Sequence, residues 1–184
     1  MSTADTDSTA DTDSTADTDV AAVYEQFTDL PDVPMYIVTT VSADGRRAGC
    51  LMGFATRISI RPPRFLAGLS RVNHTFTVAA DADYLAVHLI GKERRDLAEL
   101  FGGRTGDEID KFAECAWTEG LVRESPGLPI LDDAAAWMCG RILERVPLGD
   151  HVGHLLEPVA TEIRRDVPVV SFFDIRHLTP GHPA

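Results

Sequence analysis

The sequence is poor in cysteine and contains no long apolar run. Its three cysteines, Cys50, Cys115 and Cys139, are widely spaced, form no CxxC pair and lie near no histidine at the spacing of a zinc site. Such a pattern is typical of reduced thiols in a cytoplasm rather than of a disulfide framework. No segment reaches the ~18 apolar residues of a membrane span, and the N-terminus lacks the basic and apolar regions of a signal peptide. We therefore expect a cytoplasmic protein without a membrane anchor.

Basic residues are also scarce, since 17 Lys and Arg stand against 29 Asp and Glu and give a formal charge of −12. Residues 2–19 are three copies of STADTD, whose six aspartates account for half of that charge and leave −6 for the rest. A polar acidic repeat cannot bury enough surface to offset its ordering entropy, so residues 1–20 are predicted to be a disordered tail. The acidic remainder argues against nonspecific binding to nucleic acid or membranes.

The common fingerprints of nucleotide-binding and hydrolytic sites are missing as well. The sequence contains no GxGxxG motif, no P-loop and no nucleophile elbow. Its 184 residues, 44% of them apolar, are enough to build the core of one domain. We assign that domain to residues 21–178 and expect a loose C-terminus over residues 179–184.

The apolar patterns predict a mainly β fold. Runs rich in β-branched, aromatic and other apolar residues predict strands at 35–41, 48–54, 64–70, 84–90, 134–146, 151–163 and 167–173. Helical spacing predicts short helices at 21–27, 74–79, 92–101 and 105–116. Because the helices do not alternate strictly with the strands, we expect a mainly antiparallel barrel rather than a doubly wound parallel sheet.

The stretch from Ala48 to Thr75 combines features of a ligand site. Gly49 and Gly53 leave strand backbone uncovered, so that a ligand can come close. Pro62-Pro63 then forces a corner, and a further strand leads to a helix start at Asn73. Unpaired amides and partial positive charge at a helix start favour a phosphate, although most such junctions bind nothing. The added donors would come from Ser70, Arg71, Asn73, His74 and Thr75.

Three features of the chain resemble the flavin reductase-like group of FMN-binding split barrels. Gly49 is followed thirteen positions later by the double proline, then by a strand and a polar helix start. The helix segment Asp96–Phe101 (DLAELF) and the turn Gly149-Asp150-His151 are similar to the same group. The resemblance covers residues 34–173. Where this chain has Leu51, Gly53 and Phe54, members that reduce free flavin often carry Thr, Asn and Ser.

The resemblance implies an antiparallel split β-barrel with a few short helices that acts as an NAD(P)H-dependent flavin reductase. FMN, or FAD in its place, would accept a hydride from NADH or NADPH. The ring and ribityl chain would lie against Gly53, Phe54, Ala55 and Thr56, the phosphate against residues 70–75 named above, and the nicotinamide beside His151. The resemblance further implies a homodimer and a partner monooxygenase that uses the reduced flavin.

Two alternatives to a reductase remain. One is a binding module that holds flavin or haem without turnover, and the other is an FMN oxidase similar to pyridoxamine-phosphate oxidase. Both His88 and His151 also have structural interpretations, His88 as a satisfied core residue and His151 as a turn residue. His151 and His154 are not expected to share a metal, because in a strand this spacing directs the two rings to opposite faces.

Overall fold

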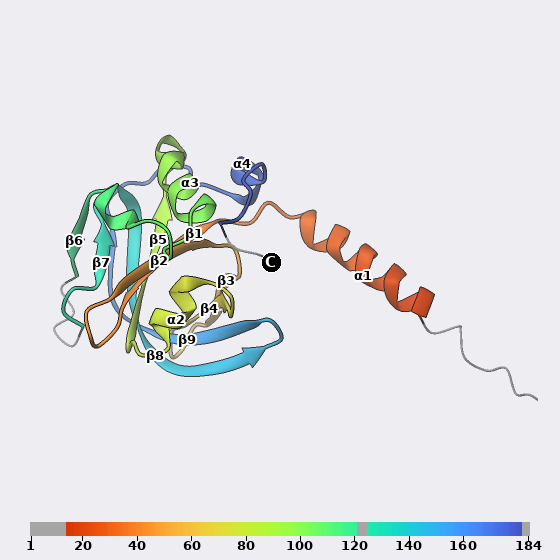
Figure 1. Cartoon of the computed structure of the whole chain (residues 1–184), viewed down its shortest axis with the longest axis horizontal. Coiled ribbons are helices and arrows are strands. Elements are labelled where there is room, and N and C mark those ends of the chain that lie inside the picture. The colour runs from red at the N-terminus through yellow and green to blue at the C-terminus, as the bar shows by residue number, and fades with distance from the viewer. Residues whose placement is uncertain (1–13, 121–124, 182–184) are drawn as a thin grey trace, which may run out of the picture. The chain divides into compact units, whose positions relative to one another are not determined.

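The computed structural model describes residues 14–120 and 125–181 and divides the chain into two compact units, Met1–Asp32 and Val33–Ala184 (Figure 1). The first unit contains helix α1 (Ser14–Asp29), which begins seven residues before the predicted start at residue 21. Alanines favour a helix here and no glycine or proline interrupts it. The third STADTD copy is therefore largely helical. The first two copies lie outside the described residues, so the disordered tail stays a prediction for that part.

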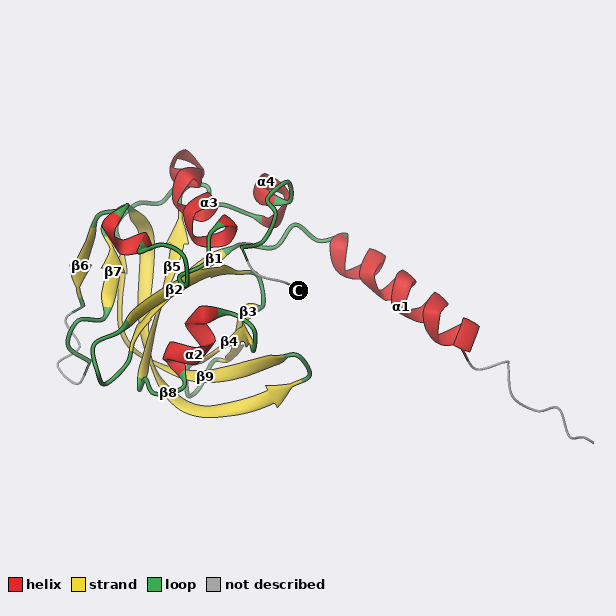
Figure 2. Cartoon of the chain, viewed as in Figure 1, coloured by secondary structure: helices red, strands yellow, loops and turns green. Residues whose placement is uncertain are grey.

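The second unit is mainly β with a few short helices (Figure 2). Its strands are β1 (Tyr36–Val41), β2 (Arg47–Met52), β3 (Ala55–Ser59), β4 (Arg64–Ser70), β5 (Tyr84–Ile90), β6 (Trp117–Glu119), β7 (Pro129–Leu131), β8 (Ala134–Leu148) and β9 (His151–Ile163). Its helices are α2 (His74–Ala79), α3 (Arg95–Gly103) and α4 (Phe172–Ile175), with single 3-10 turns at Lys92–Arg94 and Lys111–Ala113. Within the described ranges, no helix is long and apolar enough to cross a membrane.

Seven antiparallel strands form one sheet in the order β2-β1-β5-β8-β9-β4-β3. Its two edge strands, β2 and β3, are consecutive in the chain and are separated only by Gly53 and Phe54. Such a link reaches about 10 Å, so the sheet must curl until its two edges lie close together. Over the described part of the chain no ladder joins β2 to β3. The mainly antiparallel β prediction is confirmed, and a closed barrel is not formed by the strand pairing.

The curled sheet carries apolar clusters on both faces. One cluster includes the fully buried Leu69, Leu85 and Leu156, and another packs Phe101 of α3 against the sheet. A side chain at Gly49 would place its Cβ 2.7 Å from the Phe101 ring. Gly49 therefore leaves room for this ring on the side where a Cβ would point.

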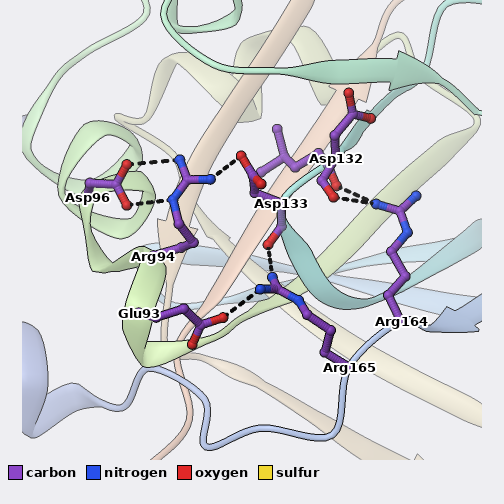
Figure 3. Close-up of polar contacts among 8 residues, drawn as sticks. Glu93, Arg94, Asp96, Asp132, Asp133, Arg164 and Arg165 are labelled. Carbon is purple, nitrogen blue, oxygen red and sulfur yellow. Dashed lines mark hydrogen bonds and ion pairs between the residues drawn. The ribbon is translucent and has the colours of Figure 1, made fainter.

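A network of ion pairs and hydrogen bonds links three segments of the second unit (Figure 3). Arg94 contacts both Asp96 and Asp133, and Arg165 contacts Glu93 at 2.7 Å and the backbone carbonyl of Asp133. The network joins the start of α3, the turn between β7 and β8, and the segment after β9. Since these pairs are partly exposed, each adds at most about 1 kcal/mol to stability.

Two predicted elements are wrong. The only helical turn in residues 105–116, predicted as one helix with an apolar stripe, is the 3-10 turn Lys111–Ala113, and Ala113 and Ala116 of that stripe are exposed. Instead Lys111 is buried and its ammonium donates 3.0 Å hydrogen bonds to the carbonyls of Gly49 and Phe101. This tertiary contact prevails over the local helical spacing of apolar residues.

The predicted last strand at 167–173 is also absent. The segment makes only isolated bridges, from Val169 to Gly91 and from Ser171 to Pro34. Ser171 and Asp174 then form a reciprocal capping box that starts α4. Before it, the sequence analysis missed the short strands β6 and β7, which are connected by residues 120–128. Residues 121–124 of this connection lie outside the described residues.

Candidate functional site

A crevice of about 260 Å3 opens beside the Gly53–Phe54 corner, where the two edges of the sheet meet. One wall comes from β2 and the corner, a second from the turn between β4 and α2 together with the start of β9, and a third from the C-terminal segment around α4. The crevice is lined by Met35, Cys50, Leu51, Met52, Gly53, Phe54, Ser70, Asn73, Gly102, His151, Phe172, Ile175, Arg176, Leu178 and Pro180.

Half of the residues predicted for the site line this crevice. The structure brings together Gly53, Phe54, Ser70, Asn73 and His151, which are up to 98 positions apart in the sequence. The residues predicted for the site that do not line the crevice are Ala55, Thr56, Arg71, His74 and Thr75. Ala55, Arg71 and His74 directly follow lining residues, and Thr56 and Thr75 lie one position further along the chain, so the predicted segments are placed together.

Ala55 and Thr56 belong to the edge ladder of β3. They pair with Ala67 and Leu66 of β4, and Ala55 also packs against the core. The amide of Ala55 donates a 2.9 Å hydrogen bond to the carbonyl of Gly53. The corner therefore presents Gly53 and Phe54 to the crevice, while Ala55 packs against the core and Thr56 is exposed on the edge strand.

The start of α2 uses its polar groups internally. The side chain of Asn73 accepts a 2.9 Å hydrogen bond from the amide of Thr75, and the amide of Asn73 donates to Ser70. The amides of Arg71 and Phe76 donate to the carbonyls of Asp150 and Asn73. Thr75 is itself buried. The backbone amides that were expected to be free therefore mostly donate hydrogen bonds within the protein. An anion at this turn would have to be bound by side chains.

His74 and Arg71 are the two cationic or ionisable side chains of the turn. His74 Nδ1 lies 2.7 Å from Asp107, and this hydrogen bond, with a second from Thr105, lowers the pKa of the Asp107 carboxyl. Arg71 is exposed, and its Nε makes only a long contact of 3.4 Å to the carbonyl of Gly149. Arg71 consequently keeps most of its hydrogen-bonding capacity for another group.

His151 stands at the mouth of the crevice in a fixed orientation. Its ring meets the ring of Phe54 edge-on, with centroids 4.9 Å apart. Its Nδ1 lies 2.8 Å from the carboxylate of Asp150, which lowers the pKa of Asp150 and directs the imidazole Nε2 away from that residue. Asp150 serves the turn as well, because its carbonyl accepts the amide of Arg71.

His154 and His88 are buried in the fold and do not line the crevice. His154 is fully buried while His151 is partly exposed, as expected for the two faces of β9. His88 is buried between the carbonyl of Ile37 and the amide of Leu131, which confirms its interpretation as a satisfied core residue. Across residues 14–120 and 125–181, no group of three or more His, Cys, Asp or Glu side chains could hold a metal ion.

Sequence reasoning missed the third wall of the crevice. The segment after α4 contributes Arg176, Leu178 and Pro180, and it is held in place by an amide hydrogen bond from Gly181 to the carbonyl of Gly102. The sequence analysis predicted no element for residues 174–178 and a loose end for residues 179–184, so no local pattern indicated this wall. Only the long-range packing against β2 and α3 brings it to the site.

The profile of the family described as "Flavin reductase like domain" matches residues 32–178, which is most of the chain. The chain belongs to the flavin reductase-like family. Its resemblance to this family, inferred above from the double proline, the helix segment and the Gly-Asp-His turn, is confirmed.

Several curated relatives are 26–30% identical to this chain over aligned stretches of 115 to 147 residues. The NADH:riboflavin 5'-phosphate oxidoreductase of Streptomyces pristinaespiralis is 30% identical over 135 residues, covering 73% of this chain and 72% of its own length. The reductase component of a flavin-dependent trigonelline monooxygenase from Acinetobacter baylyi is 26% identical over 115 residues, 62% of this chain. The chain spans only 35% of that relative's length.

A solved structure from the flavin reductase-like group agrees with the fold. The flavin reductase domain protein of Arthrobacter sp. FB24 superposes with a TM-score of 0.73 at 22% identity and covers 89% of this chain and 96% of its own. At this level of identity the likeness concerns the fold alone.

Proposed function

We propose that this protein is an NADH-dependent FMN reductase whose flavin binds in the crevice at the Gly53–Phe54 corner. The observation that carries the proposal is that one crevice unites the uncovered corner, the polar turn after β4 and the oriented His151. Membership of the flavin reductase-like family and the names of its NADH-dependent relatives support it.

The residues of the crevice fit a flat, largely apolar ring with a polar edge. Leu51, Met52 and Phe54 supply apolar surface, whereas Ser70 and Asn73 supply hydrogen-bonding groups along one side. The floor at Gly53 is tight, since a Cβ there would lie 3.2 Å from Met35 Sδ. The glycine therefore leaves room for Met35, which lines the same crevice.

When bound, FMN supplies the hydride chemistry, accepting a hydride from NADH while solvent provides the accompanying proton. The chain needs to supply position and charge. In our proposal Gly53 and Phe54, with the neighbouring Ala55 and Thr56, support the ring and ribityl chain. Ser70, Arg71, Asn73, His74 and Thr75 form the turn that holds the phosphate, and Arg71 provides the positive charge.

His151 is proposed to position the nicotinamide through its Nε2. Replacing His151 with Ala should lower kcat/KM for NADH about tenfold, the effect of one lost hydrogen bond, and leave the Kd for FMN within about threefold. Steady-state kinetics and a flavin fluorescence titration measure the two quantities. Asp150→Asn should show a smaller effect of the same kind, because it loosens the ring orientation. An unchanged kcat/KM in H151A would contradict the assignment.

The finer architecture that we propose is a split barrel that forms a homodimer. The meeting of the two sheet edges at Gly53–Phe54 supports the barrel. Phe54, Ile58 and Ile60 are 69%, 51% and 69% exposed on or beside the edge strand β3, and a second copy of the chain would cover this apolar surface.

We also propose a flavin-dependent monooxygenase as the user of the reduced flavin. The proposal follows from relatives that are named as reductase components of such enzymes. A cytoplasmic location is proposed with it, and the three cysteines, free in the structure, agree with a reducing compartment.

Purified protein with NADH and added FMN tests the function. We expect oxidation of NADH, followed at 340 nm, well above the rate without protein, and reduction of FMN under anaerobic conditions. The visible spectrum addresses the alternatives, because a Soret band would indicate a haem module. No acceleration with NADH or NADPH would reject the reductase and leave a flavin-binding module or an amine oxidase.

A further inference from the structure

The C-terminal wall of the crevice carries a charged residue that the proposed function has not used. Arg176 is the only Lys, Arg, Asp or Glu among the described residues that line the crevice. It follows α4 directly and faces a lining that is otherwise apolar or neutral apart from His151. An arginine in such a place, without a carboxylate among the lining residues, is available to an anionic ligand.

The wall that carries Arg176 is anchored to the rest of the fold. Asp174 of α4 accepts a 2.8 Å ion pair from Lys92 and takes part in the capping box with Ser171. The Arg176 guanidinium lies 5.5 Å from the centre of the Phe173 ring, within the range of a cation–π contact. The Asp174 contacts fix α4, and the cation–π contact leaves the Arg176 side chain exposed beside Phe173.

A flavin reductase must accommodate two phosphorylated molecules, the flavin and the dinucleotide. The turn between β4 and α2 offers Arg71 and His74 for one of these anions. Arg176 belongs to a different wall, and its side chain is exposed at the rim. An exposed rim residue suits the ligand that enters and leaves in every turnover.

We propose that Arg176 recognises the pyrophosphate of the dinucleotide and thereby sets the KM for NADH. The inference rests on the proposed function and adds a specificity residue to the same site. The planar guanidinium of Arg176 can donate hydrogen bonds to two phosphate oxygens at once, which a lysine ammonium cannot do in the same geometry. The recognition is electrostatic, so it weakens with added salt.

The test compares Arg176→Ala with Arg176→Lys and the parent protein. R176A should raise the KM for NADH about tenfold, with kcat and the Kd for FMN changed less than twofold, and R176K should recover part of the loss. With 1-benzyl-1,4-dihydronicotinamide, an uncharged hydride donor without phosphates, parent and R176A should react at equal rates. Arg61→Ala, which removes an exposed arginine outside the crevice, is the matched control.

The outcomes separate this inference from the proposed function. An active parent protein with an unchanged KM for NADH in R176A, or an equal loss with the uncharged donor, would overturn the role of Arg176 alone. A loss of FMN affinity in R176A would assign the residue to the flavin instead and equally overturn the inference. A parent protein that oxidises no nucleotide would overturn both.

Discussion

Replacing Arg71 with Ala is expected to weaken FMN binding by a factor of about 10 to 100 while riboflavin binding changes less than about twofold. The two flavins differ only in the phosphate, so the comparison isolates the anion. Arg71 stands on the turn that lines the crevice through Ser70 and Asn73, and its side chain makes one long hydrogen bond, 3.4 Å from Nε to the carbonyl of Gly149. Removing the Arg71 side chain therefore breaks few contacts of the fold and removes a strong hydrogen-bond donor to the phosphate.

Isothermal titration with FMN and riboflavin measures both affinities. Arg57→Ala serves as the control, because Arg57 is an exposed arginine of the edge strand β3 that does not line the crevice. R57A should bind both flavins as the parent protein does. Equal losses for FMN and riboflavin in R71A would show that the phosphate lies elsewhere.

The unfolding free energy is expected to fall by about 3 kcal/mol between pH 6.5 and pH 4 through His88 alone. Burial lowers the pKa of His88 from 6.5 to about 4, outweighing the hydrogen bond to the Ile37 carbonyl. Between these two values the unfolded chain binds a proton that the folded chain does not. The contribution of His88 to stability is therefore complete above pH 6.5 and is lost as the pH falls to 4.

Urea unfolding from pH 7 to pH 4 measures this slope. His88→Gln should reduce it, whereas His177→Gln, at a histidine whose side chain is 58% exposed, should not. If H88Q does not fold, a ring titration of His88 by NMR in the parent protein decides, with a neutral ring expected down to about pH 4. A His88 that titrates near 6.5 in the folded protein would contradict the prediction.

The sequence predicted the fold best where local pattern and tertiary environment agree. The strand at Tyr84–Ile90 was predicted with its observed bounds, because an apolar run of that length suits a central strand between β1 and β8. It failed at 105–116, where helical spacing suggested a buried apolar stripe. There the buried group is the Lys111 ammonium, and its two carbonyl partners come from β2 and α3. No local pattern encodes such a contact.

The candidate site was predictable in its segments and less so in its individual contacts. Gly53, Ser70 and His151 were placed together by resemblance to a family, and the crevice unites them. The sequence could not show that the amides around Asn73 donate hydrogen bonds within the turn, because these bonds depend on the three-dimensional geometry of the turn. Arg176 was missed because its position at the crevice depends on how the C-terminal segment packs against the rest of the fold.

A crystal structure of the protein with bound FMN tests the central claim most directly. The account predicts the flavin ring against Gly53 and Phe54, with His151 at its edge and the phosphate within hydrogen-bonding distance of Arg71 or His74. A flavin bound elsewhere, for instance in the apolar groove between Tyr36, Trp137 and Ile163, with the corner crevice empty, would contradict it.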